Sequence, residues 1–174
     1  MKKFDEIKGL CKIIDLKKLR RTEGVLFDAV PDEFLNTLCG LDRVIHISNA
    51  ISPGPINGVE RPWYMHPYQS DNLLVLSGER HIDLYSEEHG KLESFVVTRD
   101  CIYMNGELVC DTPAVLTWPA YVFHRVESKE MGSSSINIAQ RVTGFDIKDN
   151  FNIYDLDSDS GEFKVIREGH RDQF

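Results

Sequence analysis

The sequence lacks a long apolar segment, a paired-cysteine motif and an apolar signal core. No run approaches the ~18 consecutive apolar residues that suggest a membrane-spanning helix. Asp5, Glu6 and Lys8 interrupt the segment that follows the N-terminal lysines, so no signal peptide is expected. The four cysteines have no CxxC spacing, which is most simply explained by buried thiols in a reducing compartment. We therefore expect a cytoplasmic protein with no membrane partner.

Clustered positive charge is also scarce. The formal net charge is -8, and the longest basic cluster covers only residues 17–21. Because the mean field of an acidic protein repels polyanions, nucleic acid is not expected as a general partner. The expected partner is a small molecule. A length of 174 residues suits one domain with its own hydrophobic core.

Short apolar segments separated by turns dominate the middle of the chain. Between Trp63 and Arg141 they recur every 8 to 12 residues or so, which is typical of a sandwich or barrel. The expected strands cover residues 44–47, 63–66, 72–77, 80–85, 92–98, 101–104, 107–110, 114–117, 122–127, 135–141 and 163–166. The predicted fold class is therefore mainly all-β, in a single domain over residues 1–174. Its parts are a barrel core at about 44–141, an N-terminal extension at 1–40 and a C-terminal extension at 145–174.

The flanking segments have weaker patterns. Residues 5–20 carry apolar side chains at near-helical spacing, although an internal glycine and an Ile-Ile pair also permit a strand. Residues 31–40 are the better helix, because Pro31 and two acids can open it and Gly40 can close it. The acidic run at 155–159 lacks the glycine and glutamate of a calcium loop, which indicates a solvated tail.

Side chains able to bind metal or transfer protons precede a buried strand near the centre of the chain. Tyr64 and His66 are two residues apart, so they project from the same face of an extended segment. Asp71 follows, and then an apolar run that ends at Ser77-Gly78, where a turn is expected. The polar group is therefore predicted to lie beside an apolar wall.

The spacing of this stretch is similar to the first motif of the cupins, small β-barrel proteins of the jelly-roll class. That motif has Gly, five residues, His-x-His, three or four residues, Glu, six residues and Gly. Here Gly58, Tyr64, His66, Asp71 and Gly78 match every spacing. Tyrosine replaces the first histidine of the motif, and aspartate replaces the glutamate.

The second cupin motif, Pro-x-Gly-x-x-His-x-x-x-Asn after an upstream glycine, is matched in part. Pro119 and His124 occupy the proline and histidine positions, whereas Pro113, Tyr121 and Ser128 replace the two glycines and the asparagine. The resemblance covers residues 58 to 128 directly.

The resemblance implies a cupin-type double-stranded β-helix, or jelly-roll barrel, with one or two N-terminal helices. It also implies one divalent metal ion inside the barrel, with His66, Asp71 and His124 as ligands and Tyr64 at the position of a fourth. Two imidazoles and a carboxylate suit Fe, Mn, Ni or Zn. A phenol that keeps its proton is a weak ligand, so Tyr64 is expected to act as a catalytic acid or to contact the substrate.

The departures from the motif leave alternatives open. Aspartate is shorter than glutamate by about 1.5 Å, whereas metal–ligand distances vary by roughly 0.2 Å. Either the backbone moves inward at Asp71, or its carboxylate acts through water, or no metal binds. Another register uses Tyr68 and Asn72 with His66 but fits the spacing less well, and Gln69 could contribute an oxygen. Taken alone, a strand histidine is more often a core residue bonded to backbone.

Three functions are compatible with these residues. The first is a metal-dependent oxygenase or isomerase acting on a small polar molecule. The second is a metal-free sugar-nucleotide isomerase or epimerase, in which a histidine paired with an acid abstracts a proton and a tyrosine returns one. Its substrate diphosphate needs cations, for which Arg61, Arg80 and Arg125 are available. The third is a non-catalytic binding or regulatory module. A homodimer is expected because open β edges need covering.

Cys101 and Cys110 present a separate question. If Asn105-Gly106 forms a two-residue hairpin turn, counting outward places the two cysteines directly opposite each other. A cross-strand disulfide is then geometrically possible, and reduced packing thiols are the alternative that a cytoplasmic location favours.

Overall fold

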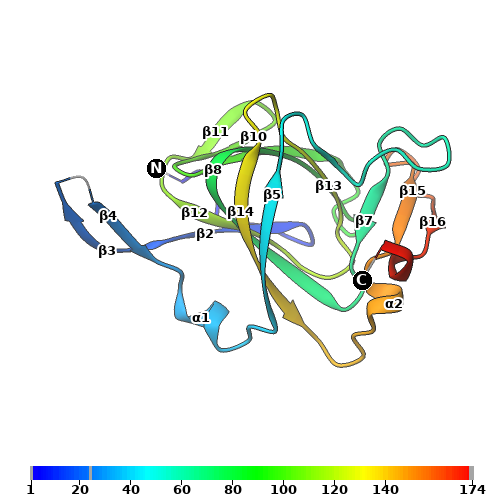
Figure 1. The fold of residues 1–174 in the computed structure, drawn as a ribbon, viewed down its shortest axis with the longest axis horizontal. Helices are drawn as coiled ribbons and strands as arrows, with labels where there is room; N and C mark the ends of the chain where they lie inside the picture. The colour runs from blue at the N-terminus through cyan, green and yellow to red at the C-terminus, as the bar shows by residue number, and fades with distance from the viewer. Residues whose placement is uncertain (1, 24, 173–174) are drawn as a thin grey trace.

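The computed structural model describes residues 2–23 and 25–172 and is built from two curved sheets that face each other (Figure 1). In the first sheet the strand order is β1-β2-β12-β8-β14-β5. Its strands are β1 (Glu6–Ile7), β2 (Cys11–Asp15), β12 (Ala114–Trp118), β8 (Gln69–Tyr85), β14 (Ser133–Arg141) and β5 (Gly40–His46). All of these pairs are antiparallel, as expected of a jelly roll.

The second sheet begins on the far half of β8. There β8 pairs with β9 on one side and β13 on the other, and β13 also pairs with β6 and β7. The remaining strands of this sheet are β6 (Ile51–Ser52), β7 (Trp63–Met65), β9 (Glu93–Thr98), β10 (Ile102–Met104), β11 (Glu107–Cys110), β13 (Phe123–Glu127), β15 (Ile153–Leu156) and β16 (Phe163–Arg167). Strand β8 therefore belongs to both sheets and closes the barrel along one side.

The prediction of a turn at Ser77-Gly78 is wrong. Strand β8 continues through these residues, and Gly78 bends it from the first sheet into the second. Gly78 has φ +69°, and a Cβ there would collide with the backbone of Gly132. The glycine thus permits a bend where two backbone segments approach closely. A glycine in the sequence is equally compatible with a turn and with such a bend.

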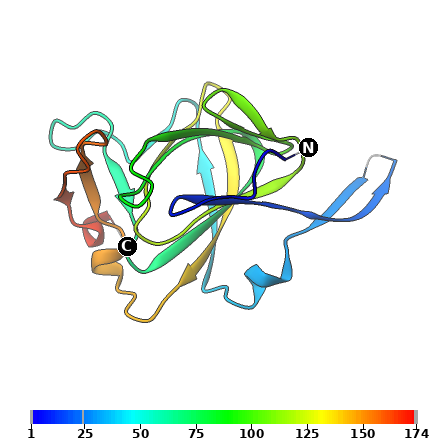
Figure 2. The ribbon, with the colours of Figure 1, turned by 180° about the vertical axis from the view of Figure 1, so that it is seen from behind.

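The N-terminal segment forms strands where a helix was one expectation for residues 5–20. Cys11 and Ile13 are buried while Lys12 is exposed, so the segment alternates with the period of a strand and pairs with β12. Strands β3 (Lys17–Thr22) and β4 (Val25–Ala29) then form a hairpin that projects away from the barrel (Figures 1 and 2).

The helix expected over residues 31–40 is shorter than predicted. Helix α1 covers only Asp32–Leu35, with Pro31 at its N-cap position, and Gly40 already begins β5. Phe34 is the buried residue of α1 and packs on Val115 and Ile138 at the outer surface of the first sheet. Burial of this single aromatic side chain anchors the short helix, which has too few residues to be stable alone.

The C-terminal segment is part of the barrel and not a solvated tail. Helix α2 (Ile147–Asn150) leads into β15, which pairs with β7, and β16 then pairs with β15. A 3-10 helix, η1 (Gly169–Asp172), follows beside α2. This pairing was missed because Asp155 and Asp157 make the run acidic, although Ile153, Tyr154 and Leu156 are buried.

The predicted pairing of Cys101 with Cys110 is also wrong. A bulge between Ile102 and Tyr103 shifts the register, so that Ile102 lies opposite Cys110. Both thiols are free. The extra residue of a bulge is invisible to a count that starts from the hairpin turn.

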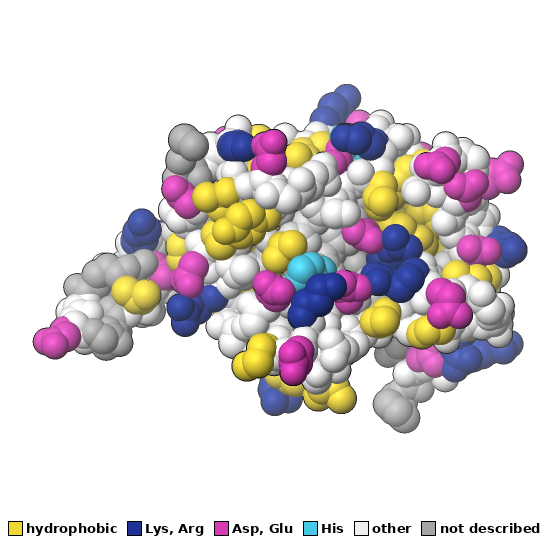
Figure 3. Space-filling model, turned by 90° about the horizontal axis from the view of Figure 1, so that it is seen from above, with side chains coloured by type: hydrophobic (Ala, Val, Ile, Leu, Met, Phe, Trp, Pro, Cys, Tyr) yellow, Lys and Arg dark blue, Asp and Glu magenta, His cyan; other side chains and the backbone are white. Residues whose placement is uncertain are grey.

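Buried apolar side chains fill the end of the barrel near β2, β9 and β12. The main cluster includes Leu10, Ile13, Ile82, Leu84, Phe95, Val97, Ile102 and Leu116. A second cluster around Trp63, Phe123 and Tyr154 supports the C-terminal strands. Among the residues that the structure describes, no helix has the length and apolar character needed to cross a membrane. In the view of Figure 3, acidic and basic side chains are interspersed over the surface.

Candidate active site

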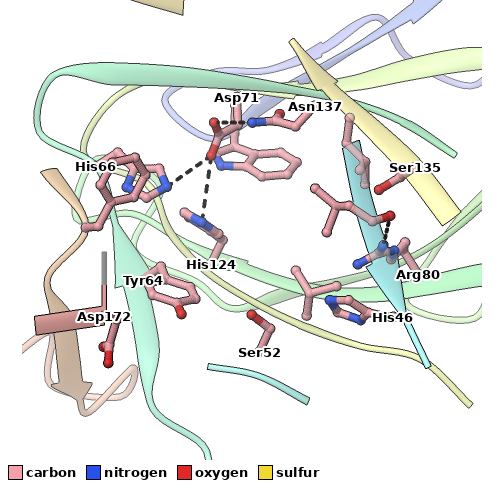
Figure 4. A pocket seen from close by; sticks show the side chains of 15 residues that line it. His46, Ser52, Tyr64, His66, Asp71, Arg80, His124, Ser135, Asn137 and Asp172 are labelled. Carbon is pink, nitrogen blue, oxygen red and sulfur yellow. Dashed lines mark hydrogen bonds and ion pairs between the residues drawn. The ribbon is translucent and has the colours of Figure 1, made fainter. Parts of the chain in front are cut away.

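Three buried side chains from distant parts of the chain meet inside the barrel. His66 directly follows β7, Asp71 is on β8 and His124 is on β13. Their exposed fractions are 7%, 3% and 5%, and their nearest nitrogen and oxygen atoms all lie within 4.8 Å of one another. Figure 4 shows both imidazoles directed at the Asp71 carboxylate. Strand pairing explains the meeting, because β13 lies beside β7 with His124 opposite Tyr64.

His66 has both ring nitrogens engaged. Its Nδ1 is 2.5 Å from the carbonyl oxygen of Asn150, and its Nε2 is 3.3 Å from Asp71 Oδ2. A carbonyl only accepts, so Nδ1 carries a hydrogen, and Nε2 faces a carboxylate that favours a second one. Burial alone would lower the pKa of His66, but Asp71 outweighs it and the net pKa is raised above 6.5. His66 is therefore an imidazolium held by two acceptors.

His124 has the opposite protonation state. Its Nδ1 donates to the carbonyl of Val122 at 3.2 Å, which leaves Nε2 as the lone-pair nitrogen of a neutral ring. Burial, and then the charge of His66, lower the pKa of His124 to about 4, although Asp71 opposes this. Its Nε2 lies 3.8 Å from Asp71 Oδ2. Two imidazoles on one carboxylate thus hold different numbers of protons near neutral pH.

The Asp71 carboxylate is fixed from both sides. Gln69 Nε2 and Asn137 Nδ2 donate to its Oδ1 at 2.7 and 2.9 Å, while Oδ2 faces the two imidazoles. Burial would raise the pKa of Asp71, but the adjacent His66, His124 and Asn137 hold it well below its usual range. Asp71 is therefore ionised at all physiological pH values. Gln69 contributes its amide nitrogen here, and its oxygen accepts from Arg141 and Asn150.

Tyr64 lies beside the two imidazoles but is not part of the cluster formed by His66, Asp71 and His124. Its ring centroid is 6.3 Å from that of His66 and 5.9 Å from that of His124. Burial raises the pKa of its phenol, and a hydrogen bond with Ser52 opposes the rise only in part. Tyr64 therefore keeps its proton, and its hydroxyl lies with Ser52 on the wall of the cavity.

These residues line a cavity of about 230 Å³ inside the barrel. The expected His66, Asp71, His124 and Tyr64 all line it, whereas Tyr68 and Asn72 of the alternative register do not. Asn72 points to the other face of β8 and donates to the carbonyl of Ile138.

Sequence reasoning missed most of the other polar residues of the cavity, and it considered Arg80 only as a cation for a substrate diphosphate. His46, Ser52, Arg80, Ser135, Asn137 and Asp172 also line the cavity. Figure 4 shows His46, Arg80 and Ser135 at the end opposite His66 and Asp71. One signal was present: Arg80 alternates with His81 and Asp83, so it falls on the apolar face of its strand. A cation on the inward face of a strand indicates an interior site.

Comparisons with known proteins give a structural likeness only. No protein-family model matches the sequence, and no curated protein matches it significantly. Among solved structures, QdtA, a sugar 3,4-ketoisomerase from Thermoanaerobacterium thermosaccharolyticum in complex with TDP, superposes with a TM-score of 0.56 at 10% identity, over 81% of this chain and 85% of that one. WlaRB, a TDP-quinovose 3,4-ketoisomerase from Campylobacter jejuni, gives 0.52 at 16% identity, over 80% and 89%.

A third neighbour is the rmlC epimerase of Mycobacterium tuberculosis, with a TM-score of 0.54 at 11% identity, over 82% of this chain and 68% of that one. Identities this low establish a common fold and leave the activity open. The jelly-roll topology, the interior site and these neighbours agree with the motif spacing: the chain has the fold of the cupin superfamily.

Proposed function

We propose that this protein moves a proton at the carbon next to a carbonyl group of a small polyhydroxy compound, as a keto-sugar isomerase or epimerase does. The observation that carries the proposal is the pair of imidazoles in opposite protonation states on one buried carboxylate. Environments that push the pKa values of neighbouring groups apart provide an acid and a base at the same pH. The chemistry needs no oxidant, because the proton that leaves one carbon returns to the substrate.

His124 acts as the base in this mechanism. Its Nε2 has a free lone pair and accepts the proton from the carbon, while the C–H electron pair forms a C=C bond and the carbonyl becomes an enolate oxygen. His66 donates a hydrogen bond or its Nε2 proton to that oxygen, and Asp71 balances the imidazolium charge. Return of the proton to the same carbon from the other side gives epimerisation. Return to the former carbonyl carbon gives isomerisation: the enolate oxygen keeps the proton from His66 as a hydroxyl, and the hydroxyl of the first carbon becomes the new carbonyl and gives its proton back to His66.

Tyr64 is a second donor. Its phenol is neutral because burial raises its pKa, and it lines the same cavity as the two imidazoles. It donates a hydrogen bond to a substrate oxygen or returns a proton to the substrate.

The cavity supports a substrate of monosaccharide size. About 230 Å³ is below the roughly 300–1,000 Å³ of pockets that enclose drug-sized ligands. Two of the three arginines considered for a diphosphate are engaged: Arg61 pairs with Glu127, and Arg125 pairs with Asp83 and covers Trp63. A sugar ring therefore fits inside, and any nucleotide attached to it lies outside the barrel.

Deuterium exchange tests the proposal. Keto sugars, free and TDP-linked, are incubated with the protein in D₂O, and exchange at the carbon next to the carbonyl is followed by NMR. We expect His124→Ala to lower the exchange rate about 100-fold or more, and Tyr64→Phe to lower it less. His81→Ala is the matched control, because His81 lies on β8 beside Glu79 and does not line the cavity. Exchange that survives His124→Ala would contradict the mechanism.

A divalent metal ion is the second candidate, favoured by one observation. Each imidazole has its Nδ1 bonded to a backbone carbonyl, which is how proteins orient histidines that ligate through Nε2. His66, Asp71 and His124 would hold the ion, and their donor set fits Fe, Mn, Ni or Zn. A bound ion would supply Lewis-acid stabilisation of an enolate oxygen.

Metal analysis of protein purified without an affinity tag separates the two candidates. Stoichiometric metal that disappears in both His66→Ala and His124→Ala, together with exchange that stops on chelation, would establish the metal-dependent version. Full exchange activity in the presence of a chelator would exclude it.

We also propose a homodimer formed through β5. Among the described strands β5 pairs only with β14, so its other edge is open. Leu41 and Ile45 expose apolar side chains beside that edge, and an antiparallel edge can pair with its own copy around a two-fold axis. Light scattering should give a dimer mass for the wild type and a monomer mass for Ile45→Glu. A monomeric wild type would contradict this.

A further inference from the structure

The cavity has a second polar end, built around Arg80. The Arg80 side chain is 2% exposed, and burial lowers its pKa to about 10, so the guanidinium is charged at neutral pH. Its Nη2 donates to the carbonyl of Val44 at 3.1 Å, and its Nε is buried with no hydrogen-bond partner. No described carboxylate forms an ion pair with it. A buried charge without a counterion is unfavourable, and a buried polar group that stays unsatisfied in a native structure calls for an explanation.

The other charges of the cavity do not compensate Arg80. Asp71 is balanced by His66, and Asp172 is bound through both carboxylate oxygens by Arg167. His46 lies near Arg80, and burial together with that cation keeps its ring neutral. The Arg80 end of the cavity therefore carries one uncompensated positive charge.

A hydroxyl group completes this end. Ser135 lines the same cavity, is 1% exposed, and has an Oγ with no hydrogen-bond partner. Figure 4 shows Ser135, Arg80 and His46 together, across the cavity from His66 and Asp71. Arg80 on β8 and Ser135 on β14 thus line one end of the cavity, and each carries a buried polar atom that has no partner within the protein.

We propose that Arg80 and Ser135 bind a carboxylate group of the ligand, so that the substrate is a small sugar acid or keto acid. This deepens the proposed function by naming its substrate class. One guanidinium balances one negative charge, which a carboxylate carries. The planar guanidinium also presents N–H groups in the geometry that a carboxylate accepts. With the carboxylate at Arg80, the remainder of the ligand extends toward His66, His124 and Tyr64.

Binding measured without turnover tests this assignment. The ¹H–¹⁵N resonance of Arg80 Nε is followed by NMR while acetate, D-glucuronate or D-galacturonate is added, with acetamide, D-glucose and D-galactose as neutral counterparts. We expect the carboxylates to shift this resonance, and at least one sugar acid to bind about tenfold more tightly than its neutral sugar. Hydrogen bonds to charged groups contribute this much or more to binding.

The variants make the test specific. Arg80→Gln and Arg80→Met should abolish the preference for sugar acids over neutral sugars. Arg43→Gln should retain it, because Arg43 is exposed on the neighbouring strand β5 and its loss changes the net charge equally. Circular dichroism confirms that each variant is folded, and a folded Arg80→Met variant suffices if Arg80→Gln is not stable.

Several outcomes would overturn the assignment. They are carboxylates that leave the Arg80 resonance unmoved, a sugar-acid preference that persists without Arg80, and inorganic phosphate binding at this resonance where carboxylates do not. Failure of the catalytic proposal is recognised separately, because His124→Ala would then leave deuterium exchange unchanged while the carboxylate preference persists.

Discussion

The two polar ends of the cavity differ in how their hydrogen bonds and charges are satisfied. At one end Asp71 accepts from Gln69 and Asn137 and balances His66, so the carboxylate is fully engaged within the protein. At the other end Arg80 and Ser135 each keep a buried polar atom without a partner. One end is complete in the free protein, and the other is completed only by a ligand.

This difference separates two tasks. Groups that react must be positioned before the substrate arrives, and a satisfied network holds the two imidazoles in fixed orientations. Groups that select a ligand gain affinity when desolvated atoms find partners, and an unsatisfied end rejects ligands that lack the matching group. Folding stability should therefore respond in opposite directions when charges are removed at the two ends.

The largest effect is expected from removing one charge at each end. Asp71→Asn leaves the His66 imidazolium without its counterion, and loss of one partner of a buried pair costs about 3–5 kcal/mol. Arg80→Met removes a buried cation that has no counterion and should raise the free energy of unfolding, by about 1–4 kcal/mol. Chemical denaturation of the ligand-free protein measures both.

The two variants serve as controls for each other, because each deletes one charge from the same cavity. Destabilisation of similar size in both would show that Arg80 has a structural partner, and the contrast between the ends would fail.

Sequence reasoning located the satisfied end because its residues are spaced by a motif. Tyr64, His66 and Asp71 fall within one short stretch, and the distance from Pro119 to His124 supplies the other side. The strand succession from 63 to 141 is likewise explained by local alternation and turn residues. Such signals are contained in a few neighbouring residues, so they can be recognised without knowing which strands pair with each other.

The unsatisfied end could not be assembled in this way. His46 on β5, Arg80 on β8 and Ser135 on β14 meet only because β14 pairs with both other strands. The same limit applies to β15, whose burial depends on pairing with β7. The bulge in the β10–β11 pair is a third case, since the unpaired Val109 shifts the register and removes the cysteine pairing that a count from the hairpin turn gives. Pairing across long sequence separations decides these features.

An intermediate effect is expected from the pH dependence of His46. Burial and the Arg80 charge lower its pKa to about 4, from 6.5 in the unfolded chain. As the pH falls below 6.5 the unfolded state takes up a proton that the folded state refuses until about pH 4, so stability falls across this window. The loss is about 3 kcal/mol, at about 1.4 kcal/mol for each pH unit.

Comparison of the wild type with His46→Gln isolates this contribution, because the variant lacks the group while the remaining acid-sensitive groups are kept. The difference in free energy of unfolding should be independent of pH above pH 7 and should change by about 3 kcal/mol between there and pH 4, to the disadvantage of the wild type. Arg80→Met should raise the pKa of His46, as seen by NMR, while the pKa of His124 at the other end stays unchanged. Equal shifts of both histidines would show that the two ends are not electrostatically independent.

The smallest effect is expected from two residues that are neighbours on the inner face of β14. Asn137 donates to Asp71 at the satisfied end, whereas Ser135 has an unpartnered hydroxyl at the other. Asn137→Ala removes a hydrogen bond to a charged group and should cost about 1.5–3 kcal/mol. Ser135→Ala removes a buried hydroxyl that bonds to nothing and should be neutral or slightly stabilising.

A bound sugar acid should change the effect of Ser135→Ala, because the Ser135 hydroxyl of the wild type then bonds to the ligand. The Ser135→Ala protein should therefore lose part of the stabilisation that the ligand gives to the wild type. Thermal unfolding with and without D-glucuronate measures this dependence. A Ser135→Ala cost that is the same in both conditions would mean that the hydroxyl does not contact the ligand.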